Sequence, residues 1–416
     1  MRPATTTQVT DAVDVGDAWA GHAVGFDVAT RDGQQFVAYY DADRRLVVAH
    51  RALGDDDWQR TELPERVPWD SHNDLALAVD AAGHLHLSGN MHVDPLTYFH
   101  TTDPLDPTTF ERVESLVGRD EDRVTYPRFL DGPDGLVFMY RDGSSGDGRR
   151  LLNAYDPDDG WRRLLDVPLL DGRDGANAYP AGPIRGPDGD FHLFWVWRDT
   201  PDAATNHDLS YARSADLRSW TRADGRPLDL PITPANDCLV DPVPSGGGLL
   251  NSNVAPGFDG EGRPTVTYHK HVGDSTEAFV ARLEGDRWRV RQVSDWGERW
   301  DFGGGGSLED RIVVDSVWPT PDGLVGTFWH AAHGPGRWLL DAETLAPVRT
   351  DAPWHGLPVE WRTPTEDRFD VQWTVDGEWA LRWEALPPNR DRPRDEVPPP
   401  SRLRVCRLDP APRRQT

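Results

Sequence analysis

Short apolar segments recur along the chain, and each begins shortly after a turn that contains Asp and Gly. The turns are Asp32-Gly33, Asp80 to Gly83, Asp134-Gly135, Asp188-Gly189, Asp259 to Gly262 and Asp322-Gly323. The apolar segments after them span residues 36–40, 85–87, 136–140, 191–197, 265–268 and 324–329. Their length and their flanking turn residues are typical of β-strands rather than helices. A further strand follows in several units, for example at residues 46–50, 209–213 and 278–283.

This repeat predicts an all-β fold, a seven-bladed β-propeller of four-stranded antiparallel blades. Six units are clear, and we expect a seventh over residues 359–383, completed by a strand at 403–408 after a Pro-rich loop at 387–400. The whole chain, residues 1–416, is then one propeller domain. The C-terminal strand or the N-terminal segment 7–15 closes the ring and removes exposed sheet edges. A parallel β-helix is the competing fold, but it needs shorter and more regular repeats.

Composition and charge narrow the range of partners. The 416 residues include 18 Trp, 39 Gly and 36 Pro, which suits many short strands and tight turns. The net charge is −26 and Lys270 is the single lysine, which argues against nucleic acid or an anionic membrane as the partner. A solvated acidic surface is the ordinary explanation of such a charge, so a site for an anionic ligand must be a local positive patch.

Two further features bear on the cellular location. The only cysteines, Cys238 and Cys406, do not make a disulfide framework. No apolar run approaches the ~20 residues of a membrane span, and the N-terminus lacks the apolar core of a signal peptide. We therefore expect the chain as given to be cytoplasmic, or secreted if a leader has been removed.

Residues 69–98 are predicted to form two strands joined by the turn at Asp80, and polar side chains gather at the far ends of these strands: His72, Asn73, Asn90 and His92. The far ends of an antiparallel hairpin lie side by side, so we predict one polar rim. His72 and His92 are candidates for acid–base chemistry, and Asn73 and Asn90 for substrate binding. His84 and His86 flank Leu85 inside the second strand, and we interpret them as packing or supporting residues.

Arginine and tyrosine supply the other candidates. Arg141 and Arg198 occupy the same place in two successive units and are each followed by Asp, so they form either a repeated salt bridge or a binding site for a carboxylate. Arg128 is a third candidate for anion binding. Tyr126 and Tyr179 each precede Pro at the start of a predicted inner strand. Each is either a buried tyrosine with an ordinary hydrogen-bond partner or an acid or base beside Arg.

Metal and phosphate sites are less clearly marked. His207, Cys238 and His269 together could ligate Zn²⁺ as a structural site, although their spacing is too irregular for a zinc motif. The Gly-rich runs 246–248 and 303–306 do not follow a strand-to-helix pattern, so we reject a phosphate-binding loop.

Several strings of residues resemble the BNR-repeat proteins that include propeller-fold polysaccharide lyases, the ulvan lyases and the L-rhamnose-α-1,4-D-glucuronate lyases. The similarity covers roughly residues 20–350. The strings are Trp69-Asp-Ser-His-Asn73, His86-Leu-Ser-Gly-Asn-Met-His92, Arg123-Val-Thr-Tyr-Pro-Arg128, Tyr140-Arg-Asp-Gly143, Asn177-Ala-Tyr-Pro180, Trp195-Val-Trp-Arg-Asp-Thr-Pro201 and Asn206-His-Asp-Leu-Ser-Tyr-Ala-Arg213.

What the resemblance implies is β-elimination at a 4-linked glucuronate in an acidic polysaccharide or oligosaccharide, leaving an unsaturated uronate. His72 and His92 match the histidine pair of ulvan lyases, and Tyr126, Arg141 and Tyr179 match the residues that complete the site. The chemistry itself requires no cofactor, although some relatives carry a structural zinc or calcium ion. Two other functions remain open: a glycoside hydrolase on the same fold, which needs paired carboxylates such as those of Asp70, Asp74 and Asp142, and a sugar-binding propeller without catalysis.

Overall fold

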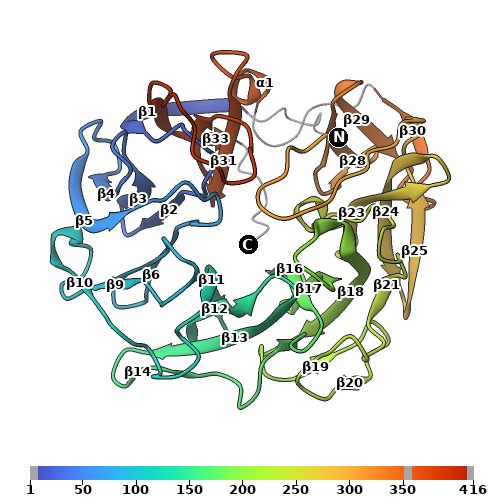
Figure 1. Ribbon diagram of the computed structural model, residues 1–416, viewed down its shortest axis with the longest axis horizontal. Helices are drawn as coiled ribbons and strands as arrows, with labels where there is room; N and C mark the ends of the chain where they lie inside the picture. The colour runs from blue at the N-terminus through green and yellow to red at the C-terminus, as the bar shows by residue number, and fades with distance from the viewer. Residues whose placement is uncertain (1–7, 351–357, 410–416) are drawn as a thin grey trace.

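The computed structural model describes residues 8–350 and 358–409, and its strands form seven antiparallel sheets arranged in a ring (Figure 1). The protein is therefore a seven-bladed β-propeller, as the repeat predicted. Each apolar segment after an Asp and Gly turn is the second strand of a blade, where both faces of the sheet are covered by neighbouring blades.

The first three blades follow one another along residues 27–171. Blade 1 consists of β2 (Asp27–Arg31), β3 (Gln34–Tyr40), β4 (Arg45–Ala52) and β5 (Gln59–Arg66). Blade 2 consists of β6 (Ala76–Val79), β7 (Leu85–Ser88), β9 (Tyr98–Thr101) and β10 (Phe110–Arg112). Blade 3 consists of β11 (Val124–Gly132), β12 (Gly135–Ser144), β13 (Asp147–Asp156) and β14 (Gly160–Arg163), with β8 (His92–Asp94) and β15 (Leu170–Asp171) added at its sides.

Four further blades complete the ring. Blade 4 consists of β16 (Asn177–Arg185), β17 (Phe191–Arg198), β18 (Asn206–Ser214), β19 (Trp220–Thr221), β20 (Pro227–Leu228) and β21 (Leu239–Asp241). Blade 5 consists of β22 (Ala255–Phe258), β23 (Pro264–Val272), β24 (Ser275–Glu284) and β25 (Arg287–Gln292). Blade 6 consists of β26 (Ile312–Val314), β27 (Trp318–Thr320), β28 (Gly323–His330), β29 (Gly334–Leu340) and β30 (Pro347–Arg349). Blade 7 consists of β31 (Asp370–Asp376), β32 (Trp379–Ala385), β33 (Ser401–Asp409) and β1 (Gln8–Ala18).

The described helices are short: the 3₁₀ turns η1 (Pro107–Thr109), η2 (Ala203–Thr205) and η3 (Asn251–Asn253), and the single α-helical turn α1 (Val359–Arg362). The predicted seventh unit therefore opens with a helical turn, and its first strand, β31, begins only at Asp370. Within residues 8–350 and 358–409, no helix is long and apolar enough to cross a membrane.

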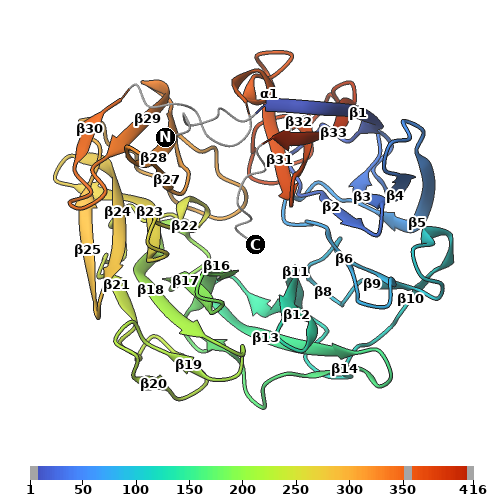
Figure 2. The same cartoon turned by 180° about the vertical axis from the view of Figure 1, so that it is seen from behind.

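Both ends of the chain close the ring in blade 7. β1 pairs antiparallel with β33, with Val13 opposite Val405 and Gly16 opposite Leu403. β33 pairs in turn with β32, so N-terminal and C-terminal segments complete the same sheet (Figure 2). The sequence predicted one or the other, and the structure uses both; Thr7, the first residue of the predicted N-terminal segment, lies outside the described residues. β33 is thus paired on both sides, and β1 is the outer strand of the blade.

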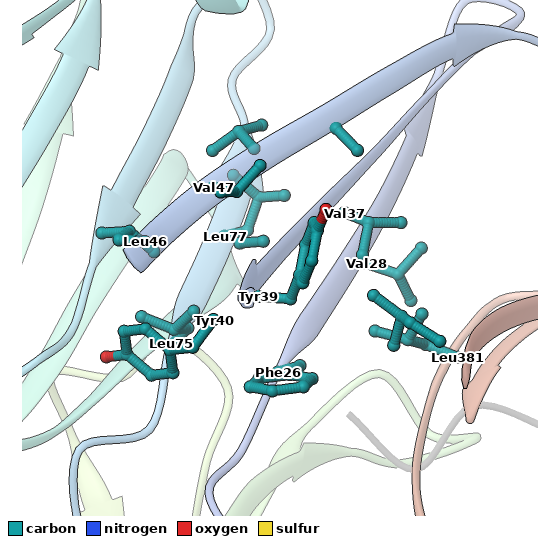
Figure 3. Packing of buried hydrophobic residues seen from close by; sticks show 14 of the residues in the cluster. Phe26, Val28, Val37, Tyr39, Tyr40, Leu46, Val47, Leu75, Leu77 and Leu381 are labelled. Atoms are coloured by element: carbon teal, nitrogen blue, oxygen red, sulfur yellow. The ribbon is translucent and has the colours of Figure 1, made fainter. Parts of the chain in front are cut away.

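Apolar side chains between blades hold the ring together. In the largest described cluster, Phe26, Val28 and Tyr39 in and next to blade 1 pack with Leu75 and Leu77 at the start of blade 2 and with Leu381 of blade 7 (Figure 3). Full burial of such a side chain contributes about 1.5–3 kcal/mol, so each blade is stabilised mainly by its two neighbours.

The inner strands surround a central channel with a volume of about 1750 Å³. Its lining includes Ser71, Asp74, Arg128 and Pro387, which come from the loop before β6, from blade 3 and from the Pro-rich loop. This loop runs between β32 and β33, as predicted. The loops at this side of the ring therefore place residues from distant parts of the sequence around one opening.

Candidate active site

His72 and His92 share the carboxylate of Asp70. His72 Nδ1 lies 2.7 Å from Asp70 Oδ1, and His92 Nδ1 lies 2.6 Å from Asp70 Oδ2. The two imidazole rings stack with their centroids 4.1 Å apart. Because each Nδ1–H donates to a carboxylate oxygen, the Nε2 atom of each neutral ring is left as the proton acceptor. Two basic nitrogens are thus held side by side.

The electrostatics of this group follow from its hydrogen bonds. Burial alone would raise the pKa of Asp70, but the hydrogen bonds from His72 and His92 lower it well below its usual range. Burial would lower the pKa of His72, but the hydrogen bond to Asp70 and the negative charges of Asp70 and Asp391 raise it above its ordinary value. Asp70 is therefore ionised, and it makes His72 a stronger base than a free imidazole.

The loop that carries His72 is fixed by residues far away in the sequence. Ser71 donates from its backbone N–H and its Oγ to Asp391 Oδ1, at 3.1 and 2.7 Å, and Asp391 Oδ2 accepts from Ser307 N at 2.8 Å. Asp391 Oδ2 also lies 3.5 Å from His72 Nδ1. Asp391 of the Pro-rich loop therefore positions the histidine loop directly, and the segment after the Gly-rich run 303–306 holds Asp391 in place.

The predicted hairpin is present, but its ends differ from the prediction. β6 and β7 pair around the turn at Asp80, with Leu77 opposite Leu87. His72 precedes β6 in a loop, however, and His92 lies on β8, which pairs with β11 of blade 3 rather than continuing blade 2. The histidine pair therefore forms at the junction of blades 2 and 3.

Tyr126 and Tyr179 extend the group across blades 3 and 4. A β-bulge interrupts the pairing of β11 between Thr125 and Arg128, and Tyr126 within it adopts a φ of 56°. A bulge re-aims a side chain and often lies beside an active site. The Tyr126 ring lies 6.0 Å from the His72 ring and 6.2 Å from the Tyr179 ring, between centroids. Tyr179 Oη lies 2.7 Å from Ser145 Oγ.

Three buried guanidiniums surround the two tyrosines. Arg141 lies 4.9 Å and Arg150 5.3 Å from the Tyr126 ring centroid, and Arg198 lies 4.2 Å from that of Tyr179. Arg141, Arg150 and Arg198 are only 0%, 2% and 9% exposed.

The three buried guanidiniums donate their hydrogen bonds to neutral oxygens. Arg141 donates to Thr125 Oγ1 at 2.9 Å and Arg150 to the Ala178 carbonyl at 3.2 Å. Arg198 donates to the hydroxyl and carboxamide oxygens of Tyr179, Ser145, Asn206 and Asn251.

The repeated Arg-Asp salt bridge is absent. Asp142, which follows Arg141, accepts from Arg149 at 2.7 Å, and Asp199, which follows Arg198, pairs with His207 at 2.9 Å. Among the described carboxylates, none lies within 4.0 Å of the guanidinium nitrogens of Arg141, Arg150 or Arg198. Of the two interpretations left open by the sequence, the structure contradicts the salt bridge.

The positive charges separate the two tyrosines chemically. Burial raises the pKa of Tyr126 to about 12, against the opposing effect of Arg141. Burial would also raise the pKa of Tyr179, but Arg198, Arg141 and the hydrogen bond from Ser145 lower it below its ordinary value. Tyr126 is therefore a protonated hydroxyl near neutral pH, whereas Tyr179 is the more acidic of the pair.

The remaining predicted binding residues have supporting partners. Asn73 is buried and its carboxamide donates to the Asp70 carbonyl at 3.0 Å. Asn90 donates to Glu65 at 2.7 Å. Arg128 donates to the Gly182 carbonyl at 3.0 Å and lines the channel. Asn73 and Asn90 thus hold the loops of the histidine pair, and Arg128 lies on the channel side of β11.

The structure does not bring the predicted metal ligands together. The ligand atoms of His207, Cys238 and His269 do not fall within 4.8 Å of one another. His207 is held between Asp199 and Asp208, at 2.9 Å each. Cys238 packs in the apolar cluster of blades 3 and 4, and His269 packs beneath Trp300. The three side chains lie in different surroundings, so this predicted zinc site is wrong.

Three residues of this group were not predicted as site residues from the sequence: Asp70, Arg150 and Asp391. Asp70 was considered only as one of the paired carboxylates of a glycoside hydrolase, although its position two residues before His72 was a signal for a carboxylate that orients an imidazole. Arg150 lies directly opposite Arg141 in the β12–β13 pair, which the four-stranded pattern of a blade could have revealed. Asp391 had no signal, because its contact depends on how a long loop folds.

Comparison with known proteins agrees with the fold. The model of a family described as "BNR repeat-containing family member" matches residues 34–296, more than half of the chain. The chain belongs to this BNR repeat-containing family. The polysaccharide lyase Uly1 aligns with a TM-score of 0.69 and 13% identity, over 96% of this chain and 99% of that one. An ulvan lyase bound to -[GlcA(1-4)Rha3S]- aligns with a TM-score of 0.65 and 13% identity, over 94% and 95%.

At this identity, the two lyases show that this member of the BNR repeat-containing family shares their fold over nearly its whole length. A search among curated proteins finds no match.

Proposed function

We propose that this propeller is a polysaccharide lyase that cleaves a 4-linked glucuronate, of the rhamnose–glucuronate type, by β-elimination. The observation that carries the proposal is the group of three buried guanidiniums that lack a carboxylate partner, next to two tyrosines and a histidine pair. A uronate carboxylate is the ligand that such a group would accept.

The arginines are arranged at a cost to stability that an anion would relieve. Arg141 and Arg150 lie directly opposite each other on β12 and β13, and like charges in this position are destabilising. Burial and the charge of Arg141 lower the pKa of Arg150 to about 9, so it remains charged at neutral pH. A bound carboxylate supplies the missing charge-assisted hydrogen bonds, for which the planar guanidinium is well suited.

The remaining groups match the proton transfers of an elimination. Neutralising the carboxylate makes the C5 proton acidic and stabilises the negative charge that develops as this proton leaves. An Nε2 atom of the Asp70-bound histidine pair takes the C5 proton, and the Tyr126 hydroxyl donates a proton to the departing O4. The C5–H and C4–O4 bonds break, the C4–C5 double bond forms, and no cofactor is needed for this balance.

The fold relatives support the same proposal. One of them is named a polysaccharide lyase, and another is an ulvan lyase bound to -[GlcA(1-4)Rha3S]-, so the propeller of the second accommodates a glycan that contains GlcA. An acidic polysaccharide or oligosaccharide is accordingly the proposed partner of this chain.

The carboxylates favour a lyase over a glycoside hydrolase. A hydrolase needs two carboxyl groups free to face the scissile bond. Both oxygens of Asp70 accept from the histidines, Asp142 pairs with Arg149, and half-buried Asp74 accepts from Gly25 N at 2.6 Å. All three candidate carboxylates are thus engaged in supporting contacts.

One assay distinguishes the candidate functions. The protein is incubated with glucuronate-containing polysaccharides while the ultraviolet absorbance of an unsaturated uronate is followed. A lyase produces this absorbance together with new reducing ends. Reducing ends without the absorbance indicate a hydrolase, and binding without products indicates a sugar-binding protein.

Two neighbouring arginines provide a matched pair of variants for this assay. We expect Arg150→Met to raise KM by about 10- to 100-fold, since a hydrogen bond to a charged group contributes about 1.5–3 kcal/mol. Thermal stability should stay equal or rise, because a like-charge contact is removed. Arg149→Met, whose side chain is already paired with Asp142 and Asp120, should leave KM almost unchanged. Equal KM values for both variants would contradict the proposed carboxylate site.

A further inference from the structure

A second cluster of potential ligands lies in blade 2, at the opposite end of the β6–β7 hairpin from His72 and His92. Asp80 is in the turn, His86 is on β7 and His100 is on β9. One ligand atom from each of these residues lies within 4.8 Å of the other two. Asp80 is 5% exposed and His86 is fully buried. Two strands and a turn of one blade therefore converge on one point.

Asp80 and His86, the two buried members of this cluster, face each other, and the atoms that face each other make no hydrogen bond. Asp80 Oδ2 and His86 Nε2 are both inaccessible to solvent, and neither makes a hydrogen bond. They lie 3.4 Å apart, which is long for a hydrogen bond to a carboxylate. Two ligands of a tetrahedral zinc ion, bound at about 2.0–2.1 Å each, are separated by roughly 3.4 Å. The spacing therefore suits a shared metal ion.

The other polar atoms of the cluster have partners that would orient these ligands. Asp80 Oδ1 accepts from the backbone N–H groups of Ala82 and His84, at 2.9 Å each. His86 Nδ1 lies 2.6 Å from Tyr98 Oη, which also accepts from Trp161 Nε1 at 3.0 Å. An imidazole that ligates a metal through Nε2 commonly donates its Nδ1–H to such an oxygen.

Blade 4 contains the same arrangement of His, Tyr and Asp without the third ligand, and there the His and Asp are joined by a hydrogen bond. His192 Nδ1 lies 2.7 Å from Tyr211 Oη, as His86 does from Tyr98. His192 Nε2, however, makes a hydrogen bond of 3.1 Å to Asp188 Oδ1. The cross-strand partner of His86 is His100, whereas that of His192 is Arg213. An arginine cannot ligate a cation, so blade 4 keeps only the supporting hydrogen bond.

We propose that Asp80, His86 and His100 bind a structural divalent metal ion, with Zn²⁺ the best match for two imidazoles and one carboxylate. A water molecule completes the tetrahedron. The ion would join the Asp80 turn to β7 and β9 and so stabilise the blade that leads into the histidine pair. This inference is independent of the proposed function.

Zinc binding to the whole protein tests this site. The purified protein is stripped with a chelator, reloaded with Zn²⁺ alone and analysed for metal content, while thermal unfolding is followed with and without Zn²⁺. We expect wild type to bind one zinc ion more per chain than His100→Arg, which reproduces the blade 4 arrangement, and to show a zinc-dependent rise in Tm that His100→Arg lacks. Co²⁺ in place of Zn²⁺ should give the visible absorption of a tetrahedral site in wild type only.

A matched control and a second variant make the outcome decisive. His192→Gln alters the equivalent histidine of blade 4 and should retain the zinc stoichiometry and the Tm rise. His100→Asn serves if circular dichroism shows that His100→Arg does not fold. Equal zinc binding by wild type and the His100 variants, or a loss of binding in His192→Gln as large as in those variants, would overturn the proposal.

Discussion

Asp70 is the residue that couples the two histidines, because each of its carboxylate oxygens accepts from one Nδ1 atom. A carboxamide in its place has one oxygen, so it can accept from only one of the two rings. The other imidazole then loses both its orientation and its fixed tautomer. The basicity of His72 depends on the same carboxylate, since Asp70 raises its pKa against the effect of burial.

We therefore expect Asp70→Asn to lower kcat by about 10²- to 10⁴-fold, the usual contribution of a positioned acid or base. Removing the charge lowers the pKa of His72, and a base acts in its neutral form, so the acidic limb of kcat/KM should move to lower pH. The measurement is the pH profile of uronate-product formation between about pH 5 and 8, where imidazoles titrate. Asp142→Asn, whose carboxylate pairs with Arg149, is the control and should keep the limb in place. An unshifted limb in Asp70→Asn would show that His72 is not the titrating base.

At the residue scale, the sequence predicted which side chains meet but not how they pair. His72, His92, Tyr126, Tyr179, Arg141 and Arg198 do lie together. Asn73 and Asn90, which were predicted to bind substrate, each donate a hydrogen bond that holds a loop, a pairing that the sequence did not predict. The hydrogen-bond partners of these side chains depend on loop conformations, which the hydrophobic pattern of a sequence does not specify.

At the scale of elements, the second strand of most blades could be predicted from its turn residues and apolar pattern. The short additional strands could not be predicted. β3, β7, β12, β17, β23 and β28 all lie where apolar segments follow an Asp and Gly turn. β8 is three residues long and joins blade 3, although the sequence places it next to blade 2. A segment this short has no period of its own, so its pairing is decided by the neighbouring blade.

Packing of β1, which closes the ring, should contribute to the free energy of unfolding. Val15 of β1 is fully buried in the cluster that contains Leu403 and Val405 of β33. We expect Val15→Ala to lower the free energy of unfolding by about 1.5–3 kcal/mol, since it removes two fully buried methyl groups and leaves a cavity. Asp17→Ala, an exposed position on the same strand, should change it by less than about 0.5 kcal/mol. Urea unfolding midpoints measure both, and equal effects would mean that β1 does not contribute to the core.

At the scale of the whole molecule, the charge of the protein opposes that of its proposed substrate. The chain carries a net charge of −26, whereas the proposed binding site is a buried cluster of three arginines. A polyanionic glycan is therefore repelled by the molecule at long range and attracted only close to the site. Screening acts mainly on exposed charges, because the Debye length falls from about 30 Å at 0.01 M salt to about 8 Å at 0.15 M.

This imbalance predicts an unusual dependence on ionic strength. Added salt should weaken the long-range repulsion more than the short-range attraction of the buried arginines, so kcat/KM for a polymeric substrate should rise by about two- to tenfold between low and physiological salt. A short oligosaccharide with few carboxylates should show a smaller rise, because it experiences less repulsion. Initial rates measured at several NaCl concentrations with both substrates test this. A fall in kcat/KM for the polymer would mean that a local positive field, rather than the net charge, governs its approach.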